Sequence, residues 1–262
     1  MPAEVNGKAL KLYTGCYDGK LDEVKRLCET TDGDEEPLDV NCIIHGGTAF
    51  AAAVQNGHLD IIKYLVSCGA DVNHPIHDGA TPIFIAAYRG YLEIVNFLIS
   101  HNADLETPNS KGNTPFFIAC QHCRLDIADV LAANGVKLEP VNEAGSTPFF
   151  FACQEGNADV VKFLVDRQVN TTAGKNGITP FHMACYRGHI DVVKYLVQGM
   201  GMDPLAIDGH GRTPLEVARR AQRDDVVTFL ESINPEATAA ADATACMQLE
   251  DTPCTDVGCA IA

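Results

Sequence analysis

The sequence predicts an all-α fold in which short helix pairs stack into a solenoid. The first observation is a seven-residue stretch, TPFFIAC at 114–120, that recurs along the chain with small changes. Successive copies begin 33, 33, 33, 32 and 34 residues apart, and a glycine stands two residues before each copy. A fixed period of this length indicates a repeat array, in which neighbouring copies bury a shared core. The copies begin at Thr48, Thr81, Thr114, Thr147, Thr179 and Thr213.

The recurring stretch has the chemistry of a helix start. Thr114 is of a residue type preferred as an N-cap, and Pro115 suits the first helical position, where no backbone donor is needed. A glycine nine residues after the threonine, as at Gly57 and Gly90, predicts the end of this helix, because glycine adopts the left-handed conformation easily. The third, fifth and sixth positions of the stretch are expected to face one side of the helix.

A second amphipathic helix is predicted in each repeat. Residues 59–66 (LDIIKYLV) and 190–197 (IDVVKYLV) carry apolar side chains at helical spacing. The stretch 69–73 (GADVN) then ends the helix and opens a turn. Each unit is therefore expected to consist of a turn, a helix, a turn, a second helix and a final turn.

These units resemble ankyrin repeats, whose pattern is G-x-T-P-L-H-x-A-x-x-x-G-H. The resemblance covers about residues 8–233, and a degenerate first copy aligns through Gly19, so seven repeats are expected. We therefore predict an ankyrin-repeat solenoid over residues 1–234. Residues 235–262 form an acidic tail that contains Ala, Thr and Cys and lacks apolar periodicity, and this tail is predicted to be disordered. The repeats are expected near 8–41, 46–75, 79–108, 112–141, 145–173, 177–207 and 211–234.

Composition and charge indicate which classes of partner and which compartment to expect. The chain has 19 basic and 35 acidic residues, and its net charge of −16 argues against nucleic acid or anionic lipid as a partner. The sequence shows neither an apolar stretch of membrane-spanning length nor an N-terminal secretion signal. Cys120, Cys153 and Cys185 share one small apolar position of the repeat, so we expect free thiols and a cytoplasmic protein.

The sequence shows no catalytic constellation, so we expect neither an enzyme nor a cofactor. Cys120 and Cys123 form a C-x-x-C pair around His122, which is the single candidate for metal or redox chemistry. Such chemistry would need further ligands nearby, whereas Cys120 fits a core position and Cys123 replaces a turn glycine. No metal site is therefore expected, and a metal or redox role at this pair is a remote alternative.

The resemblance implies a concave protein-binding face, built from the turn tips and from the first-helix residues just before each glycine turn. Tyr and Arg dominate binding hot spots, so two Tyr–Arg pairs are the predicted anchors. The alternative is that these pairs are ordinary solvated positions. The expected partner-binding residues are Tyr88, Arg89, Gln121, His122, Gln154, Glu155, Tyr186, Arg187, Asp78, Lys111, Asn113, Asn176 and Ile178.

One polar position of the family pattern is present in a single copy. His182 matches the histidine of the family pattern, and the resemblance implies that it bonds the neighbouring loop. Phe84, Phe117 and Phe150 stand at the same position in other repeats, where we expect aromatic packing instead of this polar bridge.

Three further hypotheses concern modification and charge. Cys259 begins a C-terminal CAIA sequence, which matches the prenylation pattern and suits farnesylation. Asn73 has a spacing that resembles ankyrin substrates of asparaginyl hydroxylases, although an Asn that bonds the turn backbone is the favoured explanation. The acidic stretch 30–37 is interpreted as a solvated loop in preference to a partner-binding patch.

We therefore predict a monomeric, non-enzymatic adaptor or scaffold that binds one or more proteins through a concave face centred on repeats three to six. In the alternative, prenylation of Cys259 recruits the adaptor to a membrane. Without that modification no membrane contact is expected. The fold alone does not identify the partner.

Overall fold

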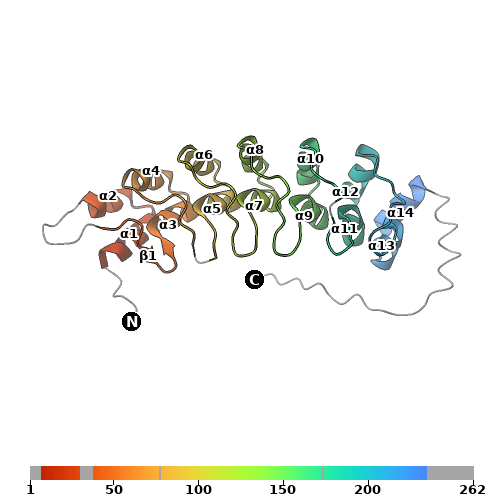
Figure 1. Cartoon of the computed structure of the whole chain (residues 1–262), viewed down its shortest axis with the longest axis horizontal. Coiled ribbons are helices and arrows are strands. Elements are labelled where there is room, and N and C mark those ends of the chain that lie inside the picture. Colours follow the sequence, from red (N-terminus) through yellow and green to blue (C-terminus); the bar gives the residue numbers. More distant parts are fainter. Residues whose placement is uncertain (1–6, 30–37, 77, 173, 235–262) are drawn as a thin grey trace.

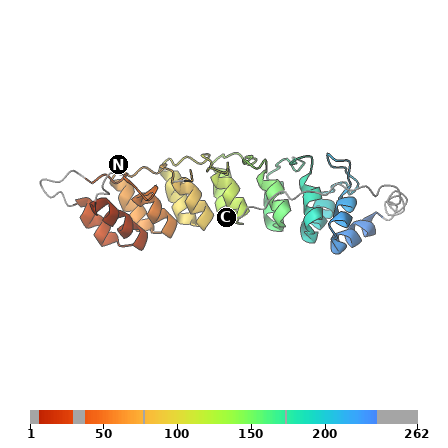
Figure 2. The same ribbon diagram turned by 90° about the horizontal axis from the view of Figure 1, so that it is seen from below.

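The computed structural model confirms the predicted solenoid and describes residues 7–29, 38–76, 78–172 and 174–234. Within these ranges, fourteen α-helices form seven pairs, which we number repeats 1 to 7 from the N-terminus. Successive pairs lie in a single row, with the connecting turns along one edge (Figure 2).

The first helices of the seven repeats are α1 (Gly7–Asp18), α3 (Ala49–Asn56), α5 (Pro82–Arg89), α7 (Pro115–Gln121), α9 (Pro148–Glu155), α11 (Pro180–Arg187) and α13 (Pro214–Arg220). The second helices are α2 (Leu21–Glu29), α4 (Leu59–Ser67), α6 (Leu92–Ser100), α8 (Leu125–Ala133), α10 (Ala158–Asp166), α12 (Ile190–Lys194) and α14 (Asp224–Ile233). A short antiparallel hairpin, β1 (Ile43–Ile44) with β2 (Gly47–Thr48), forms the turn that leads into α3.

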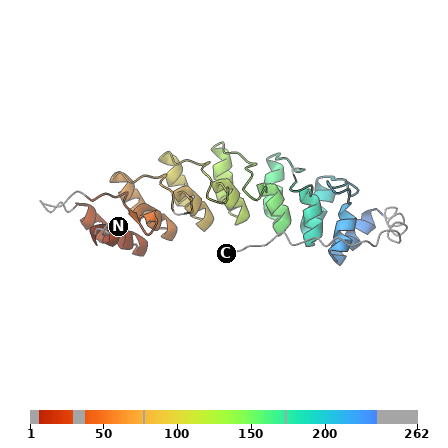
Figure 3. The same ribbon diagram turned by 60° about the horizontal axis from the view of Figure 1, so that its bottom comes forward.

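The row of repeats is arched, as Figure 1 shows. The second helices lie along the outer side of the arch, and the first helices with the turns that precede them lie toward the inner side (Figures 1 and 3). We call the concave face the surface made by these turn tips and by the last residues of the first helices. Residues far apart in sequence therefore align along one continuous surface.

Threonine side chains cap the first helices of repeats 2 and 4 to 7, as the sequence predicted. The Thr114 hydroxyl oxygen accepts a hydrogen bond from the backbone N–H of Phe117 at 3.2 Å. Thr81 differs, because its hydroxyl is buried and has no hydrogen-bond partner in the described ranges. Equivalent caps are made by Thr48, Thr147, Thr179 and Thr213.

Left-handed residues end the first helices. Gly57 and Gly90 have φ angles of 79° and 85° and form the predicted C-caps. Cys123 and Gln222 stand where other repeats have glycine, yet they adopt φ angles of 54° and 55°. The turn geometry is therefore retained even where the sequence departs from glycine.

The core runs continuously through all seven repeats. Phe116 and Phe149, from repeats 4 and 5, are 0% and 2% exposed and belong to the same apolar cluster. Phe117, where aromatic packing was expected in place of the family histidine, is also only 1% exposed, so burial is not confined to the third, fifth and sixth positions of the recurring stretch. The first helices are buried on more sides because each packs against its second helix and against the first helices of adjacent repeats.

Repeat 6 contains one feature that the sequence analysis missed. The helix α12 continues as η1 (Tyr195–Gly199), one turn of π-helix. The step from Thr179 to Thr213 is 34 residues, one longer than the commonest step. Because a π turn takes up one residue more than an α turn, it accommodates this extra residue without moving the stack.

The predicted loop bond of His182 is confirmed. Its Nε2 lies 2.9 Å from the carbonyl oxygen of Arg212 and 3.2 Å from that of Ala206, both in the next turn. Since carbonyl oxygens only accept, Nε2 carries the proton, and Nδ1 accepts from the Thr179 hydroxyl at 2.7 Å. Burial lowers the pKa of His182, against the opposing effect of the Asp208 carboxylate.

A second set of bonds joins repeats 2, 6 and 7 to the repeat that precedes each of them. In these repeats the residue before the second helix reaches back to a carbonyl at the end of the previous first helix. Thus His189 Nε2 donates to the Gln154 carbonyl at 2.8 Å, and Arg223 Nε donates to the Tyr186 carbonyl at 2.9 Å. Gly156 leaves room for this contact, because a Cβ there would lie 2.5 Å from the His189 ring.

The loops that follow the second helices are also linked from repeat to repeat. Asn41 and Asn73 accept hydrogen bonds through Oδ1 from the backbone N–H groups of Asp71 and Asp104, each at 2.8 Å. The Asn73 side chain therefore stabilises the turn, as the favoured explanation of this residue predicted. Its hydroxylation stays a prediction.

Several predictions fall outside the described residues. These are the acidic stretch 30–37, the tail 235–262 and the modification of Cys259. Within the part of the chain that the structure describes, no helix combines the length and apolar character needed to cross a bilayer.

The first testable consequence concerns the shared core. Replacing Phe116 by Ala is expected to lower the free energy of unfolding by about 3–5 kcal/mol, because it leaves a cavity between repeats. Urea unfolding of the full chain measures this loss. Lys63→Ala, at an exposed position of α4, is the control and should change the free energy by less than about 0.5 kcal/mol. A loss below about 1 kcal/mol for Phe116→Ala would contradict the assigned core.

A second prediction concerns the pH dependence of stability. Below the ordinary histidine pKa of 6.5, the unfolded chain binds a proton at position 182 that the folded chain does not, so stability falls as the pH falls. Urea midpoints at pH 7.5 and 5.5 should therefore drop less in His182→Phe than in the native chain. His182→Phe uses the residue type found in repeats 3, 4 and 5. Equal drops in the two chains would show that His182 is not the group responsible.

Candidate functional site

The concave face brings most of the predicted binding residues to the surface. Tyr88 and Tyr186 end their first helices and are 43% and 44% exposed. Arg89 and Arg187 follow them and are exposed as well. Gln121 and Gln154 are half-buried, whereas His122, Glu155, Asp78, Lys111 and Asn176 are exposed and Ile178 is half-buried.

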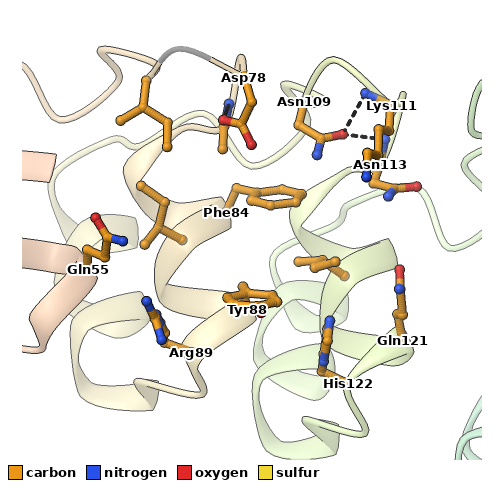
Figure 4. Close-up of a pocket in the computed structure, with 14 residues that line it drawn as sticks. Gln55, Asp78, Phe84, Tyr88, Arg89, Asn109, Lys111, Asn113, Gln121 and His122 are labelled. Atoms are coloured by element: carbon orange, nitrogen blue, oxygen red, sulfur yellow. Dashed lines mark hydrogen bonds between the residues drawn. The ribbon is translucent and has the colours of Figure 1, made fainter. Parts of the chain in front are cut away.

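A groove of about 530 Å³ crosses this face between repeats 3 and 4 (Figure 4). Phe84, Ile85 and Ile118 are among its apolar lining, and each is at most 6% exposed. Its polar lining comes from the turn tips and from the ends of the first helices. The remaining lining residues are Gln55, Ile76, Asp78, Ala80, Tyr88, Arg89, Asn109, Lys111, Asn113, Gln121 and His122.

Tyr88 stands between Arg89 and His122 in this groove (Figure 4). Its ring meets the His122 imidazole edge to face, with the centroids 4.6 Å apart and the planes at 81°. The Arg89 guanidinium carbon lies 5.7 Å from the centroid of the same ring. These contacts hold an exposed aromatic side chain in place, which is the property that makes tyrosine effective at an interface.

The charged groups of the groove are open to a partner. Neither Arg89 nor Lys111 forms an ion pair with any described residue. Burial, assisted by the nearby charge of Arg124, lowers the pKa of His122, so its imidazole is neutral near pH 7. The groove therefore combines an apolar floor with unpaired cationic side chains.

The turn tips are linked through their backbone carbonyls, which leaves the side chains of Asp78, Lys111 and Asn176 exposed. The Asp78 carbonyl accepts from Ser110 N at 2.7 Å, and the Lys111 carbonyl accepts from Glu143 N at 3.1 Å. In repeat 6, the Asn176 carbonyl accepts from His210 Nε2 at 2.9 Å. These bonds align successive tips along the concave face.

Asn113 needs a correction. It was expected to be a partner-binding residue at a turn tip that the core does not need, but it is only 8% exposed. Its Oδ1 accepts a hydrogen bond from Asn142 Nδ2 at 3.0 Å, and its own backbone N–H donates to Asn109 Oδ1 at 3.1 Å. Asn113 therefore lines the groove while it mainly holds the next turn in place.

The C-x-x-C pair is split between the core and the surface. Cys120 is 2% exposed, and burial raises the pKa of its thiol to about 12, whereas Cys123 is exposed. The described ranges hold no group of three or more His, Cys, Asp or Glu side chains that could bind a metal ion. Cys120 thus has the environment of a small apolar core residue.

Sequence reasoning missed part of the groove. Asn109 contributes to its walls, and Phe84 lies in its floor, although neither was among the predicted binding residues. Phe84 could have been found from the sequence, since it replaces the histidine of the family pattern.

Comparisons with known proteins agree with this architecture. A family described as "Ankyrin repeats (3 copies)" matches residues 9–76, 73–142 and 149–239. The crystal structure of the human ASB11 ankyrin repeat domain is similar with a TM-score of 0.69 and 24% identity, over 84% of this chain and 97% of that one. At this identity the similarity shows the fold alone.

A mouse protein, "Protein fem-1 homolog A-like" from Mus musculus, is 36% identical over 62 residues. The match spans 23% of this chain and 10% of the mouse protein. The repeat family, in contrast, matches residues distributed over all seven helix pairs. The chain belongs to the ankyrin repeat family.

Proposed function

We propose that the protein is a non-enzymatic adaptor that binds partner proteins on its concave face. The family is in general a protein–protein interaction module, and the groove between repeats 3 and 4 is the proposed central contact. The observation that carries the proposal is the exposed Tyr88 ring, held between Arg89 and His122 above an apolar floor.

The composition of the groove supports this role. The buried centre of a protein interface is apolar and rich in Tyr and Arg, and it is surrounded by polar groups. Phe84 and Ile118 supply the apolar centre here, while Asp78, Lys111 and Gln121 supply the polar rim. A partner side chain that enters the groove would be largely removed from water.

We further propose that the protein acts as a monomer in a reducing compartment, the cytoplasm. Cys153 and Cys185 are 0% exposed and pack in the apolar core as free thiols. A small buried thiol is stable as a core residue where disulfides do not form. Recruitment to a membrane through a modified Cys259 remains the alternative.

The experiment is affinity capture from cells with the full chain as bait. Tyr88→Ala is expected to weaken binding of the specific partner by about 30-fold, which corresponds to the roughly 2 kcal/mol of a hot-spot side chain. Quantitative mass spectrometry identifies the partners that are lost. A binding isotherm with the recovered partner then measures the change in Kd.

Tyr17→Ala is the matched control. Like Tyr88, Tyr17 is an exposed tyrosine near the end of a first helix, with 51% of its surface exposed. It lies in repeat 1, outside the groove. Urea unfolding must show that both variants fold. Unchanged capture by Tyr88→Ala, or an equal loss with Tyr17→Ala, would contradict the groove as the central contact.

A further inference from the structure

The concave face contains two sites of the same composition, three repeats apart. In repeat 3, Tyr88 and Arg89 end α5, and Arg124 from the next repeat reaches back so that its Nε lies 2.8 Å from where a Gly90 Cβ would be. In repeat 6, Tyr186 and Arg187 end α11.

In repeat 6, Arg223 from the next repeat reaches back over Gly188, and its Cδ lies 2.8 Å from where a Cβ at Gly188 would be. Its Nε donates to the Tyr186 carbonyl at 2.9 Å, and Arg223 as a whole is exposed. We call these clusters, Tyr88/Arg89/Arg124 and Tyr186/Arg187/Arg223, the first and second arginine stations.

The arginine stations are cationic in a strongly acidic chain. None of their four arginines forms an ion pair with a described residue, although the chain has a net charge of −16. Repeat 1 has the same layout with different charges, because Asp18 follows Tyr17 and His58 reaches back over Gly19. The paired arginines are therefore a property of repeats 3 and 6 and not of the fold.

The side chain at position 155, which lies between the two stations, carries the opposite charge. Glu155 ends α9 in repeat 5, is exposed, and accepts one hydrogen bond from the neighbouring Gln154 at 3.0 Å. Along the last residues of the first helices the charge therefore changes from cationic in repeat 3 to anionic in repeat 5 and back to cationic in repeat 6. A partner that fits this pattern is acidic at two points and not between them.

The spacing sets the length of such a partner segment. Adjacent helices pack about 8–10 Å apart, so three repeats separate the stations by roughly 24–30 Å. An extended chain advances about 3.3 Å per residue and covers this distance with about eight residues. The groove beside the first station can hold an apolar side chain of the same segment.

We propose that the two arginine stations together bind one extended peptide segment of a partner protein, with two acidic clusters about eight residues apart. This inference rests on the proposed function and specifies the chemistry of the partner. Arginine presents paired N–H donors that match a carboxylate, and the adjacent tyrosine ring can contact the aliphatic part of a Glu side chain.

The test uses the full chain and labelled synthetic peptides in fluorescence anisotropy. The first peptide has two Glu-Glu pairs eight residues apart in a Gly/Ser/Leu background, the second has the pairs three residues apart, and the third has Gln for every Glu. The first peptide, with the eight-residue spacing, is expected to bind most tightly, and its affinity should fall as the salt concentration is raised.

Charge variants then locate the site. Arg89→Gln and Arg187→Gln should each weaken binding of the first peptide by about 2- to 5-fold, the range for a partly exposed charge pair. Glu155→Gln should strengthen binding of a peptide with Glu throughout. Lys63→Gln, which removes the same charge from the exposed surface of α4, is the matched control and should have no effect.

Several results would overturn the proposal. These are equal binding of the Gln peptide, equal binding of both spacings, or equal losses with Lys63→Gln and Arg89→Gln. The tail 235–262 has five acidic residues and no Lys or Arg, so it is the competing occupant. If the acidic peptide binds only after these five residues are changed to amides, the tail occupies the stations and the proposal fails.

The outcome also separates this inference from the proposed function. If Tyr88→Ala weakens the binding of a captured partner while Arg89→Gln and Arg187→Gln leave the Kd for that partner unchanged, the concave face binds proteins and the acidic-segment proposal is wrong. If both kinds of variant retain every partner, the proposed function itself fails.

Discussion

The contact between the first helices of successive repeats is the interaction on which the rest of the structure depends. Ordering each residue costs about 1–2 kcal/mol of backbone entropy, and one helix pair has too little apolar surface to offset this cost alone. Phe116 and Phe149 are buried because repeats 4 and 5 pack on each other within one continuous core. The backbone bonds between turn tips and the His189 and Arg223 bonds then fix the register of the stack.

This packing determines which residues remain available for binding. The first helices are covered on most sides, so their exposed side chains are concentrated at the C-terminal ends, as with Tyr88 and Arg89. These residues contribute little to the core but stand on helices that the core holds rigidly. A partner can therefore bind them with little reordering of the chain, which reduces the entropic cost of association.

Much of the fold could be predicted from the sequence because the repeat is local and periodic. The Thr114 cap, the Gly57 turn and the buried Cys153 each follow from the type and position of a residue within one repeat. The burial of Asn113 could not be predicted, because it depends on its bond with Asn142 in the next repeat. The groove was also not predictable, since it arises where Phe84 and Ile118 of adjacent repeats leave space between them. Features within a repeat are thus encoded locally, whereas features between repeats depend on pairs of side chains about thirty residues apart in sequence.

Site-specific photocrosslinking in cells shows directly whether partner proteins contact the concave face. A benzoyl-phenylalanine at position 88 places the reactive group in the groove, and the same residue at position 63 places it on the exposed surface of α4. If partners bind the concave face, irradiation gives discrete adducts of the full chain with another protein from position 88 and few from position 63. Adducts from position 63 with none from position 88 would show that partners bind the outer helices, and the assignment of function to the concave face would be wrong.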